Sequence, residues 1–121
     1  MATAKSMDNK GGLRVPLDQA DYDDAERLTY NGQLLTGVAI ETDPDGGVVG
    51  ETSYSHGVLD GPDRSYRENG TLRAEEIYKF GIIQQAQQWH ENGQLAYKMH
   101  ADQFGKMISE QRWDENGDPV E

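Results

Sequence analysis

Residues 66–93 read YRENGTLRAEEIYKFGIIQQAQQWHENG, and this stretch begins and ends with the same short pattern. The pattern is an aromatic residue, a polar residue and then Glu-Asn-Gly, at residues 66–70 and again at 89–93. A third copy, WDENG, occupies residues 113–117. The final glycines of the three copies are 23 and 24 residues apart. A fixed period of this length is typical of repeat proteins, so the sequence predicts an array of similar units.

A second series of glycines lies between these copies and has the same period. Its members follow one another at intervals of 25, 24 and 24 residues: Gly32, Gly57, Gly81 and Gly105. The pair Asp45-Gly46 precedes Gly70 by 24 residues and extends the first series towards the N-terminus. We therefore place the repeats at about residues 28–46, 47–70, 71–93 and 94–117.

The runs between the glycines alternate as β-strands do. Every second residue of one run would share a face of the strand: Leu72, Ala74, Glu76 and Tyr78. Asn-Gly after such a run favours a type I′ hairpin turn, in which both central residues have positive φ. The sequence thus predicts an all-β fold, a single-layer twisted antiparallel meander of β-hairpin repeats with about eight or nine strands.

Two sets of residues are expected to build each repeat. Glycines form the turns, and aromatic or leucine side chains stack between neighbouring hairpins, where cross-strand pairs stabilise a sheet. The residues assigned to this structural role are Gly32, Gly57, Tyr66, Gly70, Leu72, Gly81, Trp89, Gly93, Leu95, Gly105, Trp113 and Gly117.

Composition is consistent with a thin sheet. The chain of 121 residues has 35% hydrophobic residues and no cysteine, which excludes disulfide bonds and cysteine metal sites. Residues 1–12 are polar, lack a signal-peptide core, and are expected to be a disordered leader before one domain at residues 13–121. No apolar run is long enough for a membrane helix, so we expect a cytoplasmic protein.

The segment from Asp18 to Arg27 lies before the repeats and is rich in aspartate. Asp18 or Asp21 is suited to capping a short helix, and an acidic loop is equally compatible with the sequence. Both alternatives stay open at this point.

Negative charge is concentrated in the first half of the chain. The net charge is −11, and residues 18–63 hold eleven acidic side chains but a single basic one, Arg27. Such a field disfavours nucleic acids and anionic membranes and attracts a basic protein surface. The simpler interpretation is that the carboxylates only solvate an exposed sheet. The candidate partner-binding residues are Asp21, Asp23, Asp24, Glu26, Asp43 and Asp45.

No pattern of catalytic or metal-binding residues is found. His56, His90 and His100 lack the spacing of a metal site. The run that begins at Asp43 resembles a calcium loop, but its twelfth position is Tyr54 rather than glutamate. No phosphate-binding loop or catalytic triad is evident. We expect a protein without catalytic activity, cofactor or metal.

The motifs YRENGTL at residues 66–72 and WHENGQL at 89–95 resemble the MORN-variant repeat of bacterial proteins. The resemblance extends over about residues 28–117, although the first unit has DGGV at 45–48 in place of Asn-Gly-x-Leu. It implies an antitoxin of a toxin–antitoxin system or an immunity protein. Such a protein would bind a partner toxin and occlude it, through an acidic face or an exposed β-edge.

Two other functions are compatible with these repeats. One is a structural scaffold that self-associates through its terminal strands. The other is a small-ligand binding module that uses the recurring aromatic side chains. Eukaryotic MORN proteins are linked to membrane phospholipid and to scaffolding, but the strong negative charge of this chain departs from them. The repeat motif is structural, so the resemblance transfers no catalytic residue.

Overall fold

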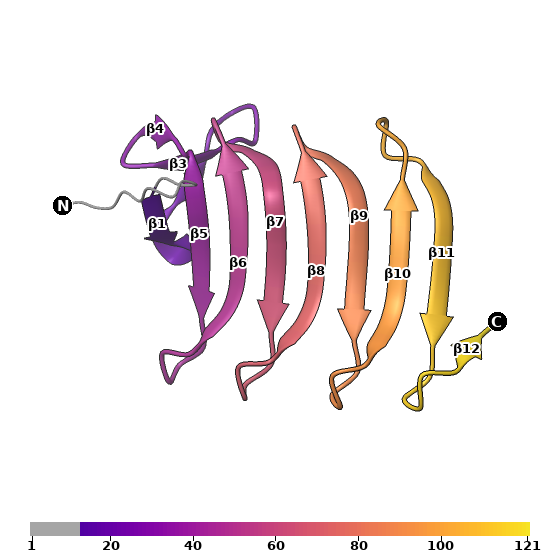
Figure 1. Ribbon diagram of the computed structural model, residues 1–121. Helices are drawn as coiled ribbons and strands as arrows, with labels where there is room; N and C mark the ends of the chain where they lie inside the picture. Colours follow the sequence, from indigo (N-terminus) through magenta and orange to yellow (C-terminus); the bar gives the residue numbers. More distant parts are fainter. Residues whose placement is uncertain (1–12) are drawn as a thin grey trace.

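A computed structural model describes residues 13–121 and confirms the all-β fold. Seven strands form an antiparallel meander in which each strand pairs with the next along the chain (Figure 1). They are β5 (Gly37–Thr42), β6 (Val48–Ser55), β7 (Val58–Tyr66), β8 (Leu72–Lys79), β9 (Ile82–Trp89), β10 (Leu95–Ala101) and β11 (Met107–Trp113). A two-residue strand, β12 (Pro119–Val120), pairs with the end of β11. The predicted leader, residues 1–12, lies outside the described residues.

The N-terminal end of the sheet is more elaborate than a meander. Strand β1 (Leu13–Pro16) pairs in parallel with β5 and forms one edge of the nine-stranded sheet. A 3₁₀ turn, η1 (Leu17–Gln19), follows it. Three short strands then form a separate antiparallel sheet: β2 (Asp21–Tyr22), β3 (Leu28–Tyr30) and β4 (Gln33–Leu34).

The segment from Asp18 to Arg27 is therefore a β-hairpin, and its only helical part is the single turn η1. Of the two expected alternatives, the short α-helix is wrong, whereas the acidic loop describes residues 23–27 between β2 and β3. One oxygen of the Asp23 carboxylate accepts the backbone N–H groups of Ala25 and Arg27. A short polar side chain that satisfies nearby N–H groups in this way favours a turn over a helix.

The main hydrophobic core lies between the two sheets at this end. Leu28 and Leu35 are fully buried there, and Val15 and Ala39 are nearly so. Leu17, Ala20, Tyr30 and Tyr54 pack around these four residues. Further along the sheet, Ala86 is the one buried apolar side chain among the described residues. The predicted single layer thus describes strands β7–β11, whereas two layers form around β1–β6.

The turns at the lower end of the sheet in Figure 1 differ from the predicted type. At residues 67–70 the Gly70 N–H donates to the Arg67 carbonyl, and the Arg67 N–H donates to the Thr71 carbonyl. Gly70 has a φ of +90°, but Asn69 is not among the residues with positive φ. This pattern is a type I turn followed by a glycine bulge, so the type I′ prediction for Asn-Gly was wrong here.

Type I′ geometry occurs instead at the opposite end of the strands. Both central residues have positive φ at two turns there, His56-Gly57 and Phe80-Gly81, and also at Asn31-Gly32, which joins β3 to β4 in the small sheet. The Asn69 side chain explains why the lower turn is different: its Oδ1 accepts the Thr71 N–H at 3.0 Å. Asn92 does the same for the N–H of Gln94. The asparagine therefore stabilises the turn through its side chain rather than through a left-handed backbone.

Hydrogen bonds from turn to turn hold neighbouring repeats together. At the lower end, Arg67 donates to the Trp89 carbonyl at 2.6 Å, and Asn92 donates to the Glu115 carbonyl at 2.8 Å. At the upper end, the N–H groups of Gly57 and Gly81 donate to the carbonyls of Leu35 and Leu59, both at 2.7 Å. These bonds span 22 or 23 residues, close to the sequence period. Each repeat is therefore stabilised by contacts with its neighbour.

Candidate protein-binding surface

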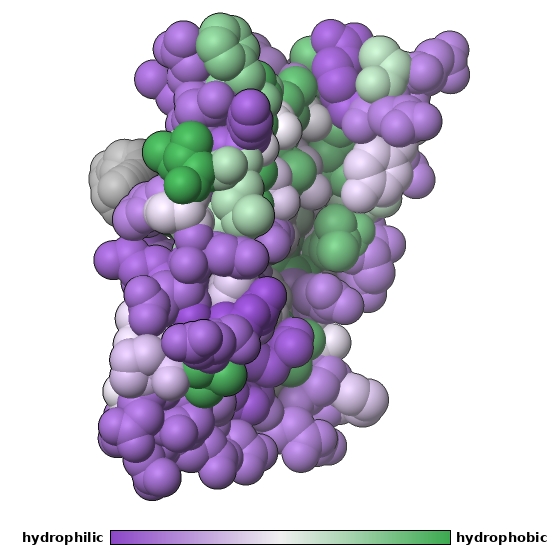
Figure 2. Space-filling model, turned by 90° about the vertical axis from the view of Figure 1, so that its right-hand side faces the viewer, coloured by the Kyte–Doolittle hydropathy of each residue, from purple (hydrophilic) through white to green (hydrophobic). Residues whose placement is uncertain are grey.

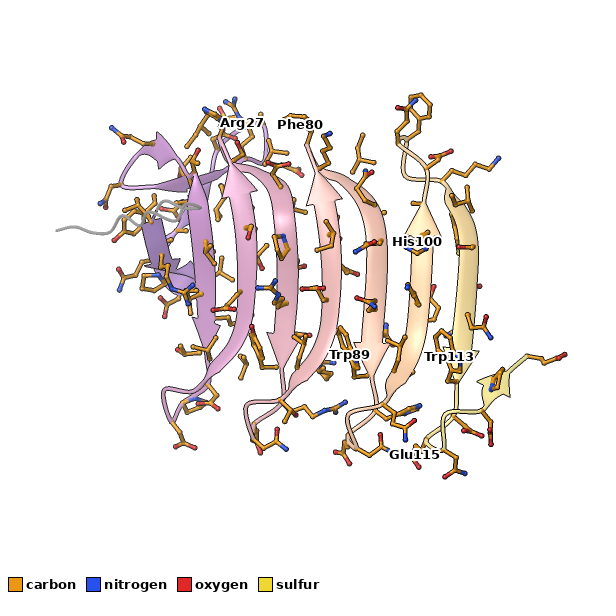
Figure 3. The ribbon with its side chains drawn as sticks, in the orientation of Figure 1. Arg27, Phe80, Trp89, His100, Trp113 and Glu115 are labelled. Carbon is orange, nitrogen blue, oxygen red and sulfur yellow. The ribbon has the colours of Figure 1, made fainter. Side chains whose placement is uncertain are left out.

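The six acidic residues predicted to bind a partner lie at two separate places. Asp21 is in β2, and Asp23, Asp24 and Glu26 are in the β2–β3 turn. This turn is close to the β6–β7 turn, because a Cβ on Gly57 would lie 2.8 Å from the Cβ of Arg27. Figure 3 shows Arg27 at the upper end of the strands.

Asp43 and Asp45 lie in the β5–β6 turn at the lower end of the sheet. Strand β6 has eight residues and separates the two ends by about 25 Å. The structure therefore does not bring the six carboxylates together into one site.

Two of these aspartates also have structural tasks. Asp23 forms an ion pair with Arg27 at 2.8 Å. The backbone N–H of Arg27 is the main cause of a lowered pKa at Asp23. Asp43 Oδ1 accepts the N–H groups of Asp45 and Gly47 and so closes the β5–β6 turn. The side chains of the other four residues form no hydrogen bond within the described part of the chain: Asp21, Asp24, Glu26 and Asp45.

A cleft of about 400 Å³ lies beside the lower acidic turn, where η1 meets the end of β5. We call it the acidic cleft. Its walls combine apolar side chains with two carboxylates that have no hydrogen-bond partner among residues 13–121. The lining residues are Pro16, Leu17, Asp18, Ile40, Glu41 and Thr42.

The Glu41 side chain has room to lie along the sheet because its neighbour on β6 is a glycine. Glu41 is paired with Gly50, and Glu41 Oε1 would be 3.3 Å from a Cβ at that position. Asp18 and Glu41 are not among the six acidic residues predicted to bind a partner, because they lie 23 residues apart and share no motif. Only the parallel pairing of β1 with β5 brings their segments together.

The chemistry of the acidic cleft suits one kind of group. A lysine or arginine side chain combines an aliphatic stem with a cationic head. Leu17 and Ile40 offer apolar contact to such a stem, and Asp18 and Glu41 offer negative charge to its head.

A second group of carboxylates lies on one face of strands β7 and β8. Asp63 and Glu76 are directly opposite each other across the two strands. Each accepts one hydroxyl, Asp63 from Thr52 and Glu76 from Tyr78, both at 2.9 Å. Like charges in directly opposed positions destabilise a sheet, and these hydroxyl groups offset part of that repulsion.

On the other face, basic residues neutralise the carboxylates. Glu51 lies on the opposite face of β6 from Thr52. Its carboxylate binds Arg14 at 2.7 Å and accepts the Tyr66 hydroxyl at 2.6 Å. Burial alone would raise the pKa of Glu51, but these two hydrogen bonds outweigh it and lower that pKa. Arg64 binds Glu75 at 2.6 Å on the same face. The two faces of the sheet therefore differ in charge.

Two partly buried tyrosines near Asp63, Tyr54 and Tyr78, are expected to titrate late. Burial raises the pKa of Tyr54 to about 12, with Tyr22 and Asp63 adding to the shift. Burial and the hydrogen bond to Glu76 raise the pKa of Tyr78 to about 12. The pKa of these two tyrosines in the folded state lies above the unfolded value of about 10. Their contribution to the stability of the fold is therefore complete below pH 10 and is lost as the pH rises towards 12.

A spectrophotometric titration at 295 nm checks this prediction. The six tyrosines should ionise in at least two steps while the chain is folded. The double variant Tyr54→Phe/Tyr78→Phe should lose the ionisations near pH 12 and keep those of the other four tyrosines. A single step near pH 10 in the folded wild-type protein would contradict the expectation.

The tryptophans of the repeat lie near the lower ends of their strands, as Figure 3 shows for Trp89 and Trp113. Their side chains are partly buried, and their backbone carbonyls accept hydrogen bonds from the preceding repeat. His90 supplies one of these bonds, from Nε2 to the Trp113 carbonyl at 2.8 Å. The described residues hold no group of three or more side chains suited to a metal ion.

Comparison with known families identifies one repeat of the array. Residues 85–103 match the MORN repeat variant. The matched segment includes most of β9, the turn at 90–93 and all of β10. No curated protein and no solved structure matches the chain significantly. The matched repeat points to a β-repeat scaffold or binding module. In residues 13–121 no helix has the length and apolar character needed to cross a bilayer.

Proposed function

We propose that the protein is a binding module for a partner protein with a basic surface, and that the partner is a toxin that it occludes. The acidic cleft is the observation that carries the proposal. It offers an apolar wall and two carboxylates without partners in the described chain, at a position where a basic side chain can enter from solvent. The toxin as partner rests on the resemblance of the repeats to bacterial MORN-variant antitoxins and immunity proteins.

Long-range charge supports the same partner. The segment 18–63, with eleven acidic residues and one basic residue, includes most of η1, the small sheet, strands β5 and β6 and the first part of β7. A field of one sign accelerates the encounter with a partner of the opposite sign. The Asp18 and Glu41 side chains would then fix where a partner lysine or arginine docks. A basic active site blocked in this way would lose access to its substrate.

Affinity capture from a lysate of the source cells tests the proposal. The protein should retain a basic protein at low salt, and the amount retained should fall in high salt, because salt screens exposed charges. Mass spectrometry identifies the captured protein, and an activity assay shows whether it is inhibited. Absence of any retained basic protein at low salt would argue against the proposal.

Two neutralising variants separate the cleft from the overall field. Asp18→Asn/Glu41→Gln and Asp24→Asn/Glu26→Asn remove the same charge, the first pair in the acidic cleft and the second at the distant β2–β3 turn. We expect both pairs to slow association with the captured partner by a similar factor. The cleft pair should in addition raise the dissociation rate by about tenfold, the effect of losing ~1.4 kcal/mol of binding free energy. Stopped-flow or surface plasmon measurements give both rates.

The second pair is the matched control, because asparagine suits the left-handed backbone at position 26, where φ is +63°. Equal dissociation rates for the two variants would show that the acidic cleft contributes nothing beyond general charge.

A further inference from the structure

Strand β11 leaves most of its outer edge without a partner strand. Strand β12 covers only Arg112 and Trp113, so residues 107–111 have no neighbour on that side in the described chain. Every residue of β11 before Trp113 is exposed, and Ile108 keeps 66% of its surface accessible. An edge of this kind presents backbone N–H and C=O groups that can pair with another strand.

The usual protection of an edge strand is weak here. Charged side chains commonly guard such edges, but those of β11 are directed to their neighbour β10. Glu110 accepts the hydroxyl of Tyr97 at 2.8 Å, and the Arg112 guanidinium lies 4.5 Å from the centre of the Tyr97 ring. The opposite edge of the sheet is protected differently, because β1 has only four residues and ends in Pro16.

Apolar and acidic side chains lie at different ends of this edge. Phe104, Met107 and Ile108 are exposed at its upper end, and the acidic turn after Trp113 lies at its lower end. Figure 2 shows this side of the molecule, with the apolar side chains mainly in its upper part and a largely hydrophilic lower part. Figure 3 places Glu115 at the bottom of this edge.

Charge distinguishes between the strands that could pair with β11. Residues 102–121 hold six acidic and two basic side chains, a net charge of −4. A second copy of the chain would bring the same negative charge to the contact, and like charges across an interface are unfavourable. A strand that carries basic residues meets complementary charge.

We propose that β11 is a docking site for one extended segment of the basic partner, which adds to the sheet as a further antiparallel strand. This proposal rests on the proposed function and assigns the contact that the partner makes away from the acidic cleft. Backbone pairing with residues 107–111 provides affinity, as in other cases of strand addition. The segment then has basic residues where it meets β12, close to the acidic turn at 114–118, and an apolar residue beside Ile108.

A designed peptide tests this docking mode. Fluorescein-labelled Lys-Lys-Thr-Val-Thr-Ile-Thr has basic residues before an alternating strand, and Glu-Glu-Thr-Val-Thr-Ile-Thr is its acidic counterpart. Fluorescence anisotropy should show binding of the basic peptide and at least about tenfold weaker binding of the acidic one, as expected for contact between like charges. Hydrogen exchange should slow at the amides of residues 107–111 when the basic peptide is bound.

Two exposed apolar residues on opposite edges provide matched variants. Ile108→Lys places a charge on the β11 edge, and Leu13→Lys places the same charge on β1, where Leu13 is also exposed. We expect Ile108→Lys to weaken peptide binding by at least about tenfold, because a lysine on an edge opposes strand pairing. Leu13→Lys should leave it unchanged. Circular dichroism confirms that both variants fold.

The outcomes separate this inference from the proposed function. Equal peptide binding by the two variants would overturn the β11 site. So would retention of the captured partner by Ile108→Lys with wild-type affinity, although the proposed function would then stand. A concentration-dependent dimer that Ile108→Lys abolishes would identify a second copy as the occupant and also overturn the inference. Failure to capture any basic partner would instead count against the proposed function.

Discussion

Leu28→Ala should lower the free energy of unfolding by about 3 kcal/mol, the usual range for a fully buried leucine being ~2–5 kcal/mol. Leu28 has no accessible surface and belongs to a core of only four buried residues. Its backbone also joins the two sheets, because the Leu28 N–H donates to the Gly57 carbonyl at 2.8 Å. The substitution therefore leaves a cavity at the one place where two layers meet.

Two spectroscopic probes should disagree in this variant. Trp89 and Trp113 lie in β9 and β11, far along the sheet from Leu28. In a repeat protein each unit is stabilised mainly by its neighbours, so the N-terminal layer can unfold before the C-terminal hairpins. Urea titration should show an early loss of part of the far-ultraviolet circular dichroism, followed by a later change in tryptophan fluorescence.

Met107→Ala is the control for this experiment, because Met107 is half exposed and lies outside the core. It should change the stability by less than about 0.5 kcal/mol, as surface substitutions usually do. If Leu28→Ala were no more damaging than Met107→Ala, the small sheet would not be a stabilising layer.

The sequence period was sufficient to predict the repeating part of the fold. Turn glycines such as Gly70 and Gly93 mark where each hairpin reverses, and residue alternation marks the strands between them. Turn type was harder to predict, because the same Asn-Gly pair is compatible with two backbone shapes. The outcome depends on whether the asparagine adopts positive φ, as Asn31 does, or accepts an N–H with its side chain, as Asn69 does.

The N-terminal layer was not predictable from the period. Segment 13–34 has no internal repeat, and its strands are only two to four residues long, which is too short for alternation to be visible. The parallel pairing of β1 with β5 depends on contacts between segments distant in the chain.

The position of the candidate binding residues in the fold could not be predicted from the sequence either. Composition identified the acidic excess within residues 18–63, but it did not indicate where these side chains lie relative to one another in the fold. Asp23 and Asp43 occupy turns at opposite ends of β6, and both carboxylates accept backbone N–H groups. Asp18 and Glu41 carried no sequence signal for binding, although the fold places them in one cleft.

Gly37→Ala should have the second large effect, a loss of about 3 kcal/mol, because it combines backbone strain with a collision. Gly37 has a φ of +153°, and a Cβ there would lie 2.3 Å from the carbonyl oxygen of Leu13 and 2.8 Å from its nitrogen. These are backbone atoms of the paired strand β1, so β1 must move away from β5. Overpacking and strained backbone each cost about 1–3 kcal/mol.

Gly46→Ala separates the two contributions. Gly46 also has positive φ, +90°, but a Cβ there would meet no atom within 4 Å. This control should lose only the strain term, about 1 kcal/mol, in urea unfolding. If the two variants were equally stable, the contact of Gly37 with Leu13 would not be what holds β1 in place.

The variants Gly37→Ala and Gly46→Ala should also differ in their effect on the acidic cleft. Pro16 is the last residue of β1, Leu17 follows it directly, and both line that cleft. Displacing β1 in Gly37→Ala should therefore open the cleft and weaken capture of the basic partner, even under conditions in which the variant stays folded. Gly46→Ala should bind as the wild-type protein does, because its turn lies outside the lining residues. Position 37 then determines both the stability of the parallel strand pair and the shape of the site, which is why a glycine is required there.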